Sequence, residues 1–435
     1  MRDNWMLTAV ALIPVVIGLT VSPAQGAAVA PHAPETLQEY LLRAALNNAG
    51  LQAAFEEWKA ALQEVPQAKA LPDPRFTYGY FIEEVETRVG PQRQRLSITQ
   101  AFPWFGTIEA RTDAVAAVAK AAQKRYEARK RQLFHDVKDA FYEYVYLQRA
   151  IAIARDDLDL VRHFEEVARN KYITATARHP DIIRAQVELA TLDDKLKALE
   201  ELRTPIVARL NAVLNRQSAE VLPWPNQELS SPGDVDRAQL FDALKQQNPQ
   251  LRAMDFDIES ARSRIELAKR RFYPDLGVGV DWIDTRDAAM PGVADSGKDP
   301  VILMFSMNLP IWRKSYEAAE LQARAAARRV SQQKQDMENS LIARAERVLY
   351  DYEDSGRKVR LYGGTLVPKA EELVGASEAA YSAGTIDFLS LIDAEQTLLR
   401  FRLQHERALT NRNQRLAELE MLVGAQLPVE WPESQ

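Results

Sequence analysis

One series of motifs occurs twice along the 435-residue sequence, in the same order both times. The distance between the two members of a pair grows slowly, from 200 to 209 residues. The paired segments are 47–54 with 247–254, 76–80 with 276–280, 100–106 with 307–313, 141–144 with 349–352, and 184–189 with 393–398. A constant order with a growing offset indicates an internal duplication with one modest insertion, so both halves are expected to fold to the same design.

Each half predicts a first helix, two strands, a very long helix and a shorter helix. Strands are predicted where bulky residues alternate with small or polar ones, and helices where helix-forming residues run with few breakers. Repeat 1 covers 28–215, with strands at 75–83 and 93–102, a long helix at 106–174 and a helix at 180–215. Repeat 2 covers 236–424, with strands at 275–283 and 300–309, a long helix at 313–383 and a helix at 386–424. A linker at 216–235 joins the repeats and a tail at 425–435 follows them.

The long helices do not suit a compact core. The segment 106–174 has no proline, and glycine only at its first position, so it predicts a rod of about 100 Å at a rise of 1.5 Å per residue. Its apolar residues step by three, four or seven, which is typical of helices packed along their length. In the second half, Gly356, Gly363, Gly364 and Pro368 interrupt the rod, and a kink is expected there.

Residues 1–27 are predicted to be a cleaved signal peptide. Arg2 precedes an apolar run at 5–21, and small residues follow at 22–28, which are the parts of a secretory signal. A retained transmembrane anchor is the alternative, but the run is short against the ~20 residues that a spanning helix needs. Further membrane contact is therefore expected to use strands or an interface.

The composition and the absence of motifs exclude several classes of protein. Without cysteine, a disulfide framework, a thiolate metal site and a cysteine nucleophile are all excluded. A formal net charge of −6 argues against a nucleic-acid-binding protein, which carries a basic surface. The five histidines lack paired ligand spacing, and no phosphate loop, nucleophile elbow or metalloprotease motif occurs. We therefore expect no enzyme activity, no cofactor and no metal site.

The number of strands points to an assembly. Four strands are too few to close a sheet, and open edges are costly in lipid or water. The missing strands are expected from other copies of the chain: two chains would supply eight strands and three would supply twelve. The bulky face would then meet lipid, and the face rich in Gly, Ser, Thr, Asp and Asn would line a lumen. A soluble helical scaffold and an adaptor-type binding protein remain as alternatives.

Over essentially its whole mature length, the chain resembles the TolC-like outer membrane efflux family. The resemblance rests on NPQLRA (248–253), QAFPWFG (100–106) and, most specifically, YSAGTIDFLSLIDAEQTL (381–398). In the last segment the family has a Tyr-x-x-Gly turn followed by a Leu-Asp-Ala element, which is Ile-Asp-Ala in this chain. The Phe-Pro-Trp-Phe-Gly form is most similar to the branch paired with heavy-metal exporters of the resistance–nodulation–division type.

The resemblance implies a fold, a location and a function. The fold is an α+β membrane protein: a homotrimer with a twelve-stranded β-barrel in the outer membrane, continued by a twelve-helix α-barrel in the periplasm. The linker would lie in an equatorial region of that α-barrel. The function is that of a passive exit duct, which receives substrate from an inner membrane pump and its periplasmic adaptor. Heavy-metal cations are the expected substrate, and drug efflux or type I polypeptide secretion are alternatives for the same fold.

The resemblance also identifies candidate gate residues at the periplasmic tip, where the long and the shorter helix of each half meet. Asp393 resembles the second of two family selectivity aspartates, and Ser390 stands at the first position. Asp181 is similar to the first-copy tip aspartate and Tyr381 to the tip tyrosine. The family arginine that ties the tip closed aligns with Ile386, so that lock is missing or replaced.

The residues themselves support both a gate role and a plainer one. In a threefold assembly, Asp181, Asp387 and Asp393 would each form a ring of three like charges, which favours cations. Asp181 and Asp387 follow helix breakers, so capping is the alternative for them. Asp393 lies inside a predicted helix, where Asp has poor propensity, which favours a lumen-facing role. Further tip residues are Tyr172 and Gly384, and the transitions from barrel to helix are expected at Pro103, Gly106 and Pro310.

Overall fold

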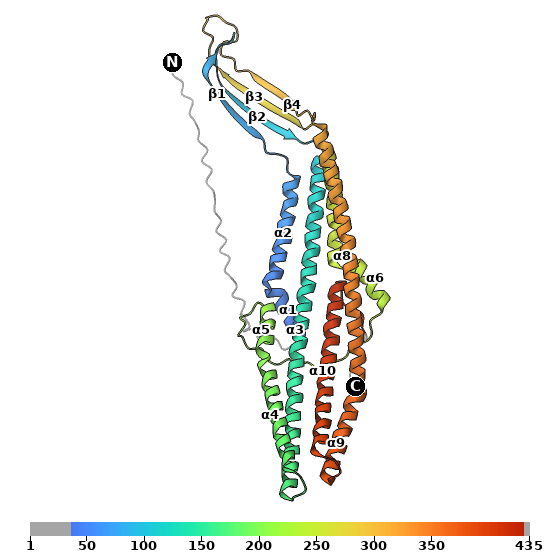
Figure 1. Ribbon diagram of the computed structural model, residues 1–435. Coiled ribbons are helices and arrows are strands. Elements are labelled where there is room, and N and C mark those ends of the chain that lie inside the picture. The colour runs from blue at the N-terminus through green and yellow to red at the C-terminus, as the bar shows by residue number, and fades with distance from the viewer. Residues whose placement is uncertain (1–35, 430–435) are drawn as a thin grey trace, which may run out of the picture.

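The computed structural model describes residues 36–429, which form an elongated molecule with a β-sheet at one end and long helices over the rest of its length (Figure 1). The first half contains α1 (Leu37–Asn47), α2 (Ala49–Lys69), β1 (Arg75–Val85), β2 (Gln92–Phe102), α3 (Thr107–Ile173), α4 (His179–Glu201) and α5 (Arg203–Val213). The second half contains α6 (Arg237–Gln247), α7 (Pro249–Arg270), β3 (Leu276–Thr285), β4 (Val301–Met307), α8 (Arg313–Leu361), a π-helical turn η1 (Tyr362–Leu366), α9 (Val367–Ala383) and α10 (Phe388–Val423). The element order thus repeats between the halves. The predicted signal peptide (1–27) and residues 430–435 lie outside the described residues.

The four strands form one antiparallel sheet in the order β1-β2-β3-β4, so each half contributes one hairpin. The register aligns Phe76, Ile98, Val280 and Leu303 in a row across all four strands. All four side chains are exposed in the single chain. One face of the sheet is therefore a continuous apolar surface that the chain itself does not cover.

The opposite face of the sheet carries mostly small and polar side chains, together with Ile283, Ile302 and Met304. Thr77, Ser97 and Asp281 lie opposite one another on β1, β2 and β3. The Arg95 guanidinium on β2 donates to the buried Asp281 carboxylate on β3, so this ion pair joins the two hairpins. The alternation between the faces follows from the period of two along each strand.

The single first helix predicted in each half is two helices, because an asparagine caps the second of them. The Asn48 and Asn248 side chains each accept a hydrogen bond from the backbone N–H three residues further on, at 3.0 and 2.9 Å. Their amide groups donate to the backbone carbonyls of Val213 (3.0 Å) and Leu422 (2.7 Å). The cap thereby ties the start of each half to the last helix of the same half.

The helix predicted at 180–215 also differs from the structure, which has α4 and α5 separated at Leu202. Pro205 lies in the first turn of α5 and has no N–H to donate to the carbonyl of Glu201, which weakens a continuous helix here. The rod predicted at 313–383 is interrupted by η1, at the place where Gly363, Gly364 and Pro368 led us to expect an interruption. Pro368 lacks the N–H that would reach the carbonyl of Gly364. The missing N–H of the proline thus accounts for the irregular turn beside it.

Two glycines of the second rod have a packing role. An ideal Cβ at Gly356 would lie 1.4 Å from the Arg412 guanidinium, and one at Gly363 would lie 2.6 Å from the His405 ring. Only a residue without a Cβ lets α10 place these side chains against α8 and η1.

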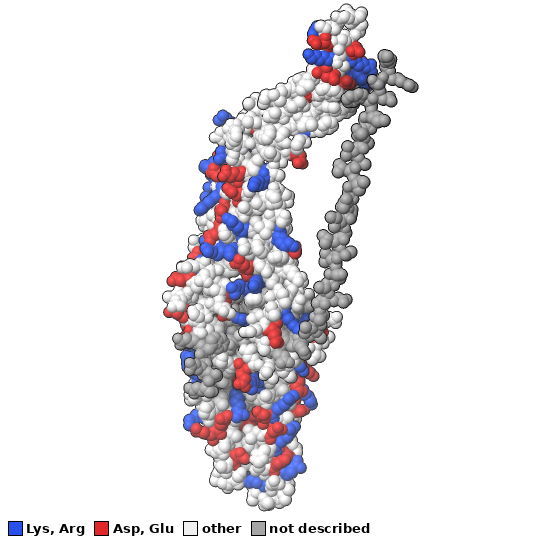
Figure 2. Space-filling model, turned by 180° about the vertical axis from the view of Figure 1, so that it is seen from behind, with Lys and Arg blue, Asp and Glu red and all other residues white. Residues whose placement is uncertain are grey.

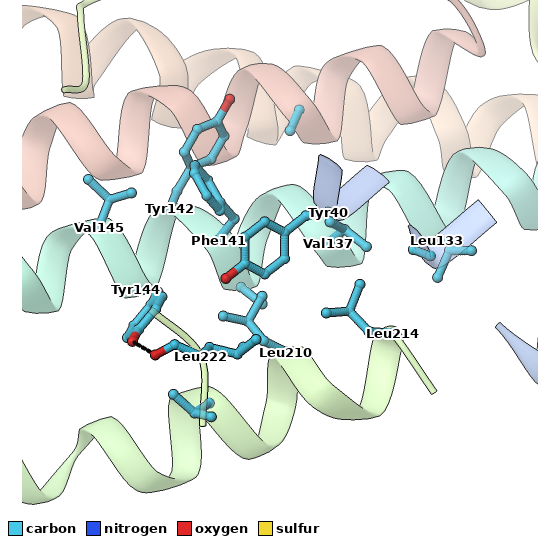
Figure 3. Close-up of a cluster of buried hydrophobic side chains, with 14 of the residues drawn as sticks. Tyr40, Leu133, Val137, Phe141, Tyr142, Tyr144, Val145, Leu210, Leu214 and Leu222 are labelled. Carbon is cyan, nitrogen blue, oxygen red and sulfur yellow. Dashed lines mark hydrogen bonds between the residues drawn. The ribbon is translucent and has the colours of Figure 1, made fainter. Parts of the chain in front are cut away.

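The core at mid-length of the helices joins elements from both ends of the first half. Figure 3 shows its aromatic centre, where the rings of Tyr40 on α1 and Phe141 on α3 are 5.3 Å apart. The Tyr144 hydroxyl donates to the carbonyl of Leu222 (3.1 Å), and Arg203 donates to the same carbonyl (2.8 Å). The start of the 216–235 linker is thus fixed to the first half.

The second half repeats this tyrosine–arginine arrangement on the end of the same linker. Tyr352 lies 208 residues after Tyr144, and its hydroxyl donates to the carbonyl of Gly233. The buried Arg412 guanidinium donates to the carbonyls of Pro232 and Gly233, both at 2.9 Å, and lies 4.4 Å from the centre of the Tyr352 ring.

Within the described part of the chain, no helix combines the length and apolarity needed to cross a membrane.

Candidate gate at the helix tips

The end of the molecule farthest from the sheet consists of two helix hairpins, α3–α4 and α9–α10 (Figure 1). In the first hairpin the chain turns through Ala175, whose φ is 58°, and the N–H of Thr176 donates to the carbonyl of Lys171 at 2.8 Å. The half-exposed Tyr172 ring lies 5.6 Å from the His179 ring. In the second hairpin Gly384, with a φ of 80°, occupies the position that corresponds to Ala175. Both turns therefore use one residue in the left-handed region.

Asp181 occupies a capping position. Its carboxylate accepts a hydrogen bond from the backbone N–H of Arg178 at 3.3 Å, in the first turn of α4. A carboxylate is favoured there by the exposed N–H groups of the helix end. The charge of Asp181 also acts on Tyr381 of the other hairpin, whose pKa it raises together with burial.

Asp387 and Ser390 form a local pair at the start of α10. The Asp387 carboxylate accepts from the backbone N–H of Ser390 (2.9 Å) and from its hydroxyl (2.7 Å). These hydrogen bonds, led by the one from the hydroxyl, hold the pKa of Asp387 below its ordinary value. Asp387 is thus the N-cap of α10, and Ser390 is occupied in that cap.

Tyr381 packs between the two hairpins and is only 3% exposed. Its ring meets the Phe388 ring edge-on at 5.3 Å, and the Lys171 ammonium lies 4.8 Å from its centre. Lys171 also donates to the backbone carbonyls of Tyr381 and Ser382. Burial, followed by the negative charge of Asp181, raises the pKa of Tyr381 to about 12. Sequence reasoning missed Lys171. The one sign of its role in the sequence is that it precedes Tyr172, which is the repeat partner of Tyr381.

Asp393 lies one turn after Ser390, on the exposed side of α10. Its neighbours Ile392 and Ala394 are buried, so Asp393 points away from the helix packing of its own chain. A ring formed by three copies of Asp393 remains a prediction about an assembly.

Sequence reasoning also missed two buried carboxyl groups, Asp157 on α3 and Glu395 on α10. The signal was present, because Glu395 stands in the apolar stripe formed by Leu391, Ile392 and Leu398, at spacings of three and four. A carboxyl group in such a stripe is rare unless it is paired.

Among residues 36–429 no group of three or more His, Cys, Asp or Glu side chains is arranged to hold a metal ion.

The junction between sheet and helices joins both halves. After Pro103, the backbone N–H of Trp104 donates to the Asp275 carboxylate of the second half (3.0 Å), and the Trp104 ring stacks on Tyr273 at 5.2 Å. Gly106 is the N-cap of α3 with a φ of 77°. In the second half Pro310 lies between β4 and α8.

The model of a family described as outer membrane efflux protein matches this chain twice, at residues 41–216 and at residues 240–425. The chain belongs to this family. Each match covers one half of the duplication, which agrees with the repeated element order. The chain therefore resides in the outer membrane and extends into the periplasm, and it is a passive efflux channel rather than an enzyme. These predictions from the sequence are confirmed by the family assignment.

Relatives and solved structures agree with the assignment. The chain is 21% identical to the cobalt-zinc-cadmium resistance protein CzcC of Cupriavidus metallidurans, over 90% of both chains. Its fold matches CusC with a TM-score of 0.71 at 14% identity, over 90% of this chain and 92% of that one. It matches the open state of the Neisseria gonorrhoeae outer membrane channel MtrE with a TM-score of 0.73 at 17% identity, over 91% and 90%. The predicted resemblance to TolC-like channels and to their metal-resistance branch is confirmed.

Proposed function

We propose that this outer membrane efflux protein works as a homotrimer and as the exit duct of a tripartite system, passing heavy-metal cations outward from an inner membrane pump and a periplasmic adaptor. The observation that carries the proposal is the four-stranded sheet, which has one exposed apolar face, one more polar face and two outer edges at β1 and β4. Helices far longer than a compact core needs continue from this sheet.

The two faces of the sheet suit a wall between lipid and water. Figure 2 shows a band almost free of charged side chains along the sheet, between charged distal loops and charged helices. At the distal end, Arg286 pairs with Glu84 (3.2 Å) and Arg93 with Asp284 (3.7 Å). An apolar band between polar ends is the pattern of a membrane-spanning strand.

The strand count favours three copies. Two copies would give eight strands, which close around an interior filled by side chains, whereas wider barrels enclose water. Three copies give twelve strands and place Asp281 and Arg95 on the lumen side. The same threefold arrangement would bring three α3–α4 hairpins and three α9–α10 hairpins together at the periplasmic tip.

The cargo proposal rests on two observations. The curated relative is named for resistance to cobalt, zinc and cadmium. The exposed Asp393 carboxylate on α10 would form a ring of negative charge in a trimer, which favours cations. Asp181 contributes negative charge beside Tyr381, whereas Asp387 and Ser390 serve the helix cap.

Deletion of the gene, with complementation, tests the proposal. Cells that lack this chain are expected to become more sensitive to zinc, cobalt or cadmium salts, and the intact gene should restore resistance. Purified protein in a planar bilayer should show cation-preferring channels. Unchanged metal tolerance together with drug sensitivity would reject the metal cargo while keeping the duct, and the absence of channels would reject the duct.

A further inference from the structure

Asp157 and Glu395 face each other between α3 and α10 in an apolar environment. Asp157 is 3% exposed and Glu395 is 0% exposed. Their sequence neighbours Leu158 and Ala394 belong to one buried cluster, so the two carboxyl groups lie close together, and each acts on the pKa of the other. Among the residues that the structure describes, no donor reaches either oxygen of Glu395 or Oδ2 of Asp157. The apolar side chains of the same cluster include Leu158, Val161, Leu391, Ile392 and Leu398.

Two carboxylates in this position cannot both be charged. Removing one ion from water is costly, and a second like charge nearby adds repulsion. One proton removes the conflict, because a neutral carboxyl group then donates a charge-assisted hydrogen bond to the remaining carboxylate. Burial raises the pKa of both groups, and the neighbouring Asp157 raises that of Glu395 further, so Glu395 is the proton donor.

The charged groups around the pair do not replace the proton. The charges of Glu188 and Lys195 on α4 and of Arg402 on α10 act on the pair. Glu188 accepts a hydrogen bond from Gln396 (2.7 Å), and Arg402 donates to Glu371 on α9 (2.6 Å). The buried side chains of α9 are Ala370, Val374, Ser377 and Tyr381, which are uncharged at neutral pH.

We propose that Asp157 and Glu395 share one proton and form a pH-dependent latch that holds α10 against α3. Glu395 lies two residues after Asp393 but faces the interior, whereas Asp393 faces outward. Loosening α10 from α3 would therefore move the candidate gate residue on the same helix. This link to gating rests on the proposed duct, whereas the shared proton does not.

The sign of the pH effect follows from the direction of the shift. The ordinary pKa of a glutamate is 4.5, and that of Glu395 is raised in the folded chain. The latch therefore stabilises the folded chain fully at a pH below the ordinary glutamate pKa. Its stabilisation weakens as the pH rises from that value toward the raised pKa of Glu395. Across that range the closed state holds one proton that the open state releases, so local opening should increase about tenfold per pH unit in each chain.

Infrared difference spectroscopy tests the shared proton directly. At pH 8 the wild-type protein should show the carbonyl stretch of a protonated carboxyl group, and Glu395→Gln should lose it. Asp156→Asn is the matched control, because Asp156 adjoins Asp157 but is exposed; this variant should keep the band. A spectrum in which the wild type and Glu395→Gln do not differ would overturn the latch.

Hydrogen exchange of α10 peptides, corrected for the intrinsic rate, tests the mechanical part. Protection should fall steeply between pH 6 and pH 9 in the wild type and in Asp156→Asn, and much less in Glu395→Gln. Equal pH dependence in all three proteins would contradict the proposal. Glutamine mimics the protonated carboxyl group, so failure of Glu395→Gln to fold would contradict it too. Neither measurement needs ion conduction, so the bilayer recordings that test the duct are independent.

Discussion

Two acidic residues on α10, only two positions apart, have opposite surroundings. Asp393 is exposed, whereas Glu395 is completely buried beside Asp157. On a helix, neighbouring residues point in different directions, so one segment can supply both a lumen charge and a core contact. Sequence reasoning identified Asp393 through the family motif. It overlooked Glu395, although the apolar stripe around this residue was visible, and it could not pair Glu395 with Asp157, because that partner on α3 is 238 residues away in the chain.

Replacing Asp393 by Asn should lower the cation preference of the channel. Removing a unit charge that acts at about 4 Å in water changes the energy of a passing ion by about 1 kcal/mol, or about fivefold in the permeability ratio. Reversal potentials in planar bilayers under a salt gradient measure this ratio. Asp387→Asn is the control: asparagine keeps the cap of α10, and we expect a smaller change. Equal ratios for the wild type and Asp393→Asn would refute the role of Asp393.

Replacing Gly356 by Ala should destabilise the protein by about 2–4 kcal/mol, since the new Cβ displaces the buried Arg412 from the carbonyls of Pro232 and Gly233. Gly375→Ala is the matched control on α9, where no atom lies within 4 Å of the added Cβ. There, alanine should stabilise the helix by up to about 1 kcal/mol. Thermal unfolding in detergent compares the two variants, and equal midpoints would contradict the packing role of Gly356.

At the scale of single elements, the sheet depends on the difference between its two faces. Phe305 on β4 is 76% exposed on the apolar face, and the adjacent Ser306 points to the polar face. Phe305→Lys should destabilise the inserted protein by about 2–4 kcal/mol, because the charge would meet lipid. Ser306→Lys, one residue away, should be tolerated in a water-filled lumen.

Urea unfolding of the reconstituted protein measures both strand variants. A larger loss for Ser306→Lys than for Phe305→Lys would mean that the faces are assigned the wrong way round. A similar loss for both would mean that neither face meets lipid.

The strands and the long helices could be predicted from the sequence, because each depends on a pattern of residues close together in the chain. Alternation at 276–280 indicates a strand whatever the neighbours are, and a stretch without breakers indicates a helix such as α3. The breaks at Asn48 and Asn248 could not be predicted from the same signals. There the asparagine amides bond to Val213 and Leu422, which are distant in sequence. Burial of Tyr381 between two hairpins is likewise a tertiary property.

At the scale of the whole molecule, the duplication determines how the halves are joined. Tyr144 with Arg203 and Tyr352 with Arg412 are repeat-related pairs, and both hold the one linker that connects the halves. The sheet is shared in the same way, with β2 and β3 paired across the repeat boundary. A single chain is thus one continuous unit, yet its β1 and β4 edges remain available for strands of other copies.

The closure of the sheet by three copies can be measured with introduced thiols, since the natural sequence contains no cysteine. Thr77→Cys on β1 is combined in turn with a cysteine at Ile302, Met304 or Ser306 on β4, and each single variant serves as a control. A disulfide requires the two Cβ atoms to approach within about 4.5 Å, so only strands paired at a shared edge will form it. After oxidation in the outer membrane, we predict that at least one combination gives a covalent trimer and nothing larger on denaturing gels. Covalent dimers as the end product, or chains that stay monomeric in every combination, would contradict a twelve-stranded barrel built by three copies.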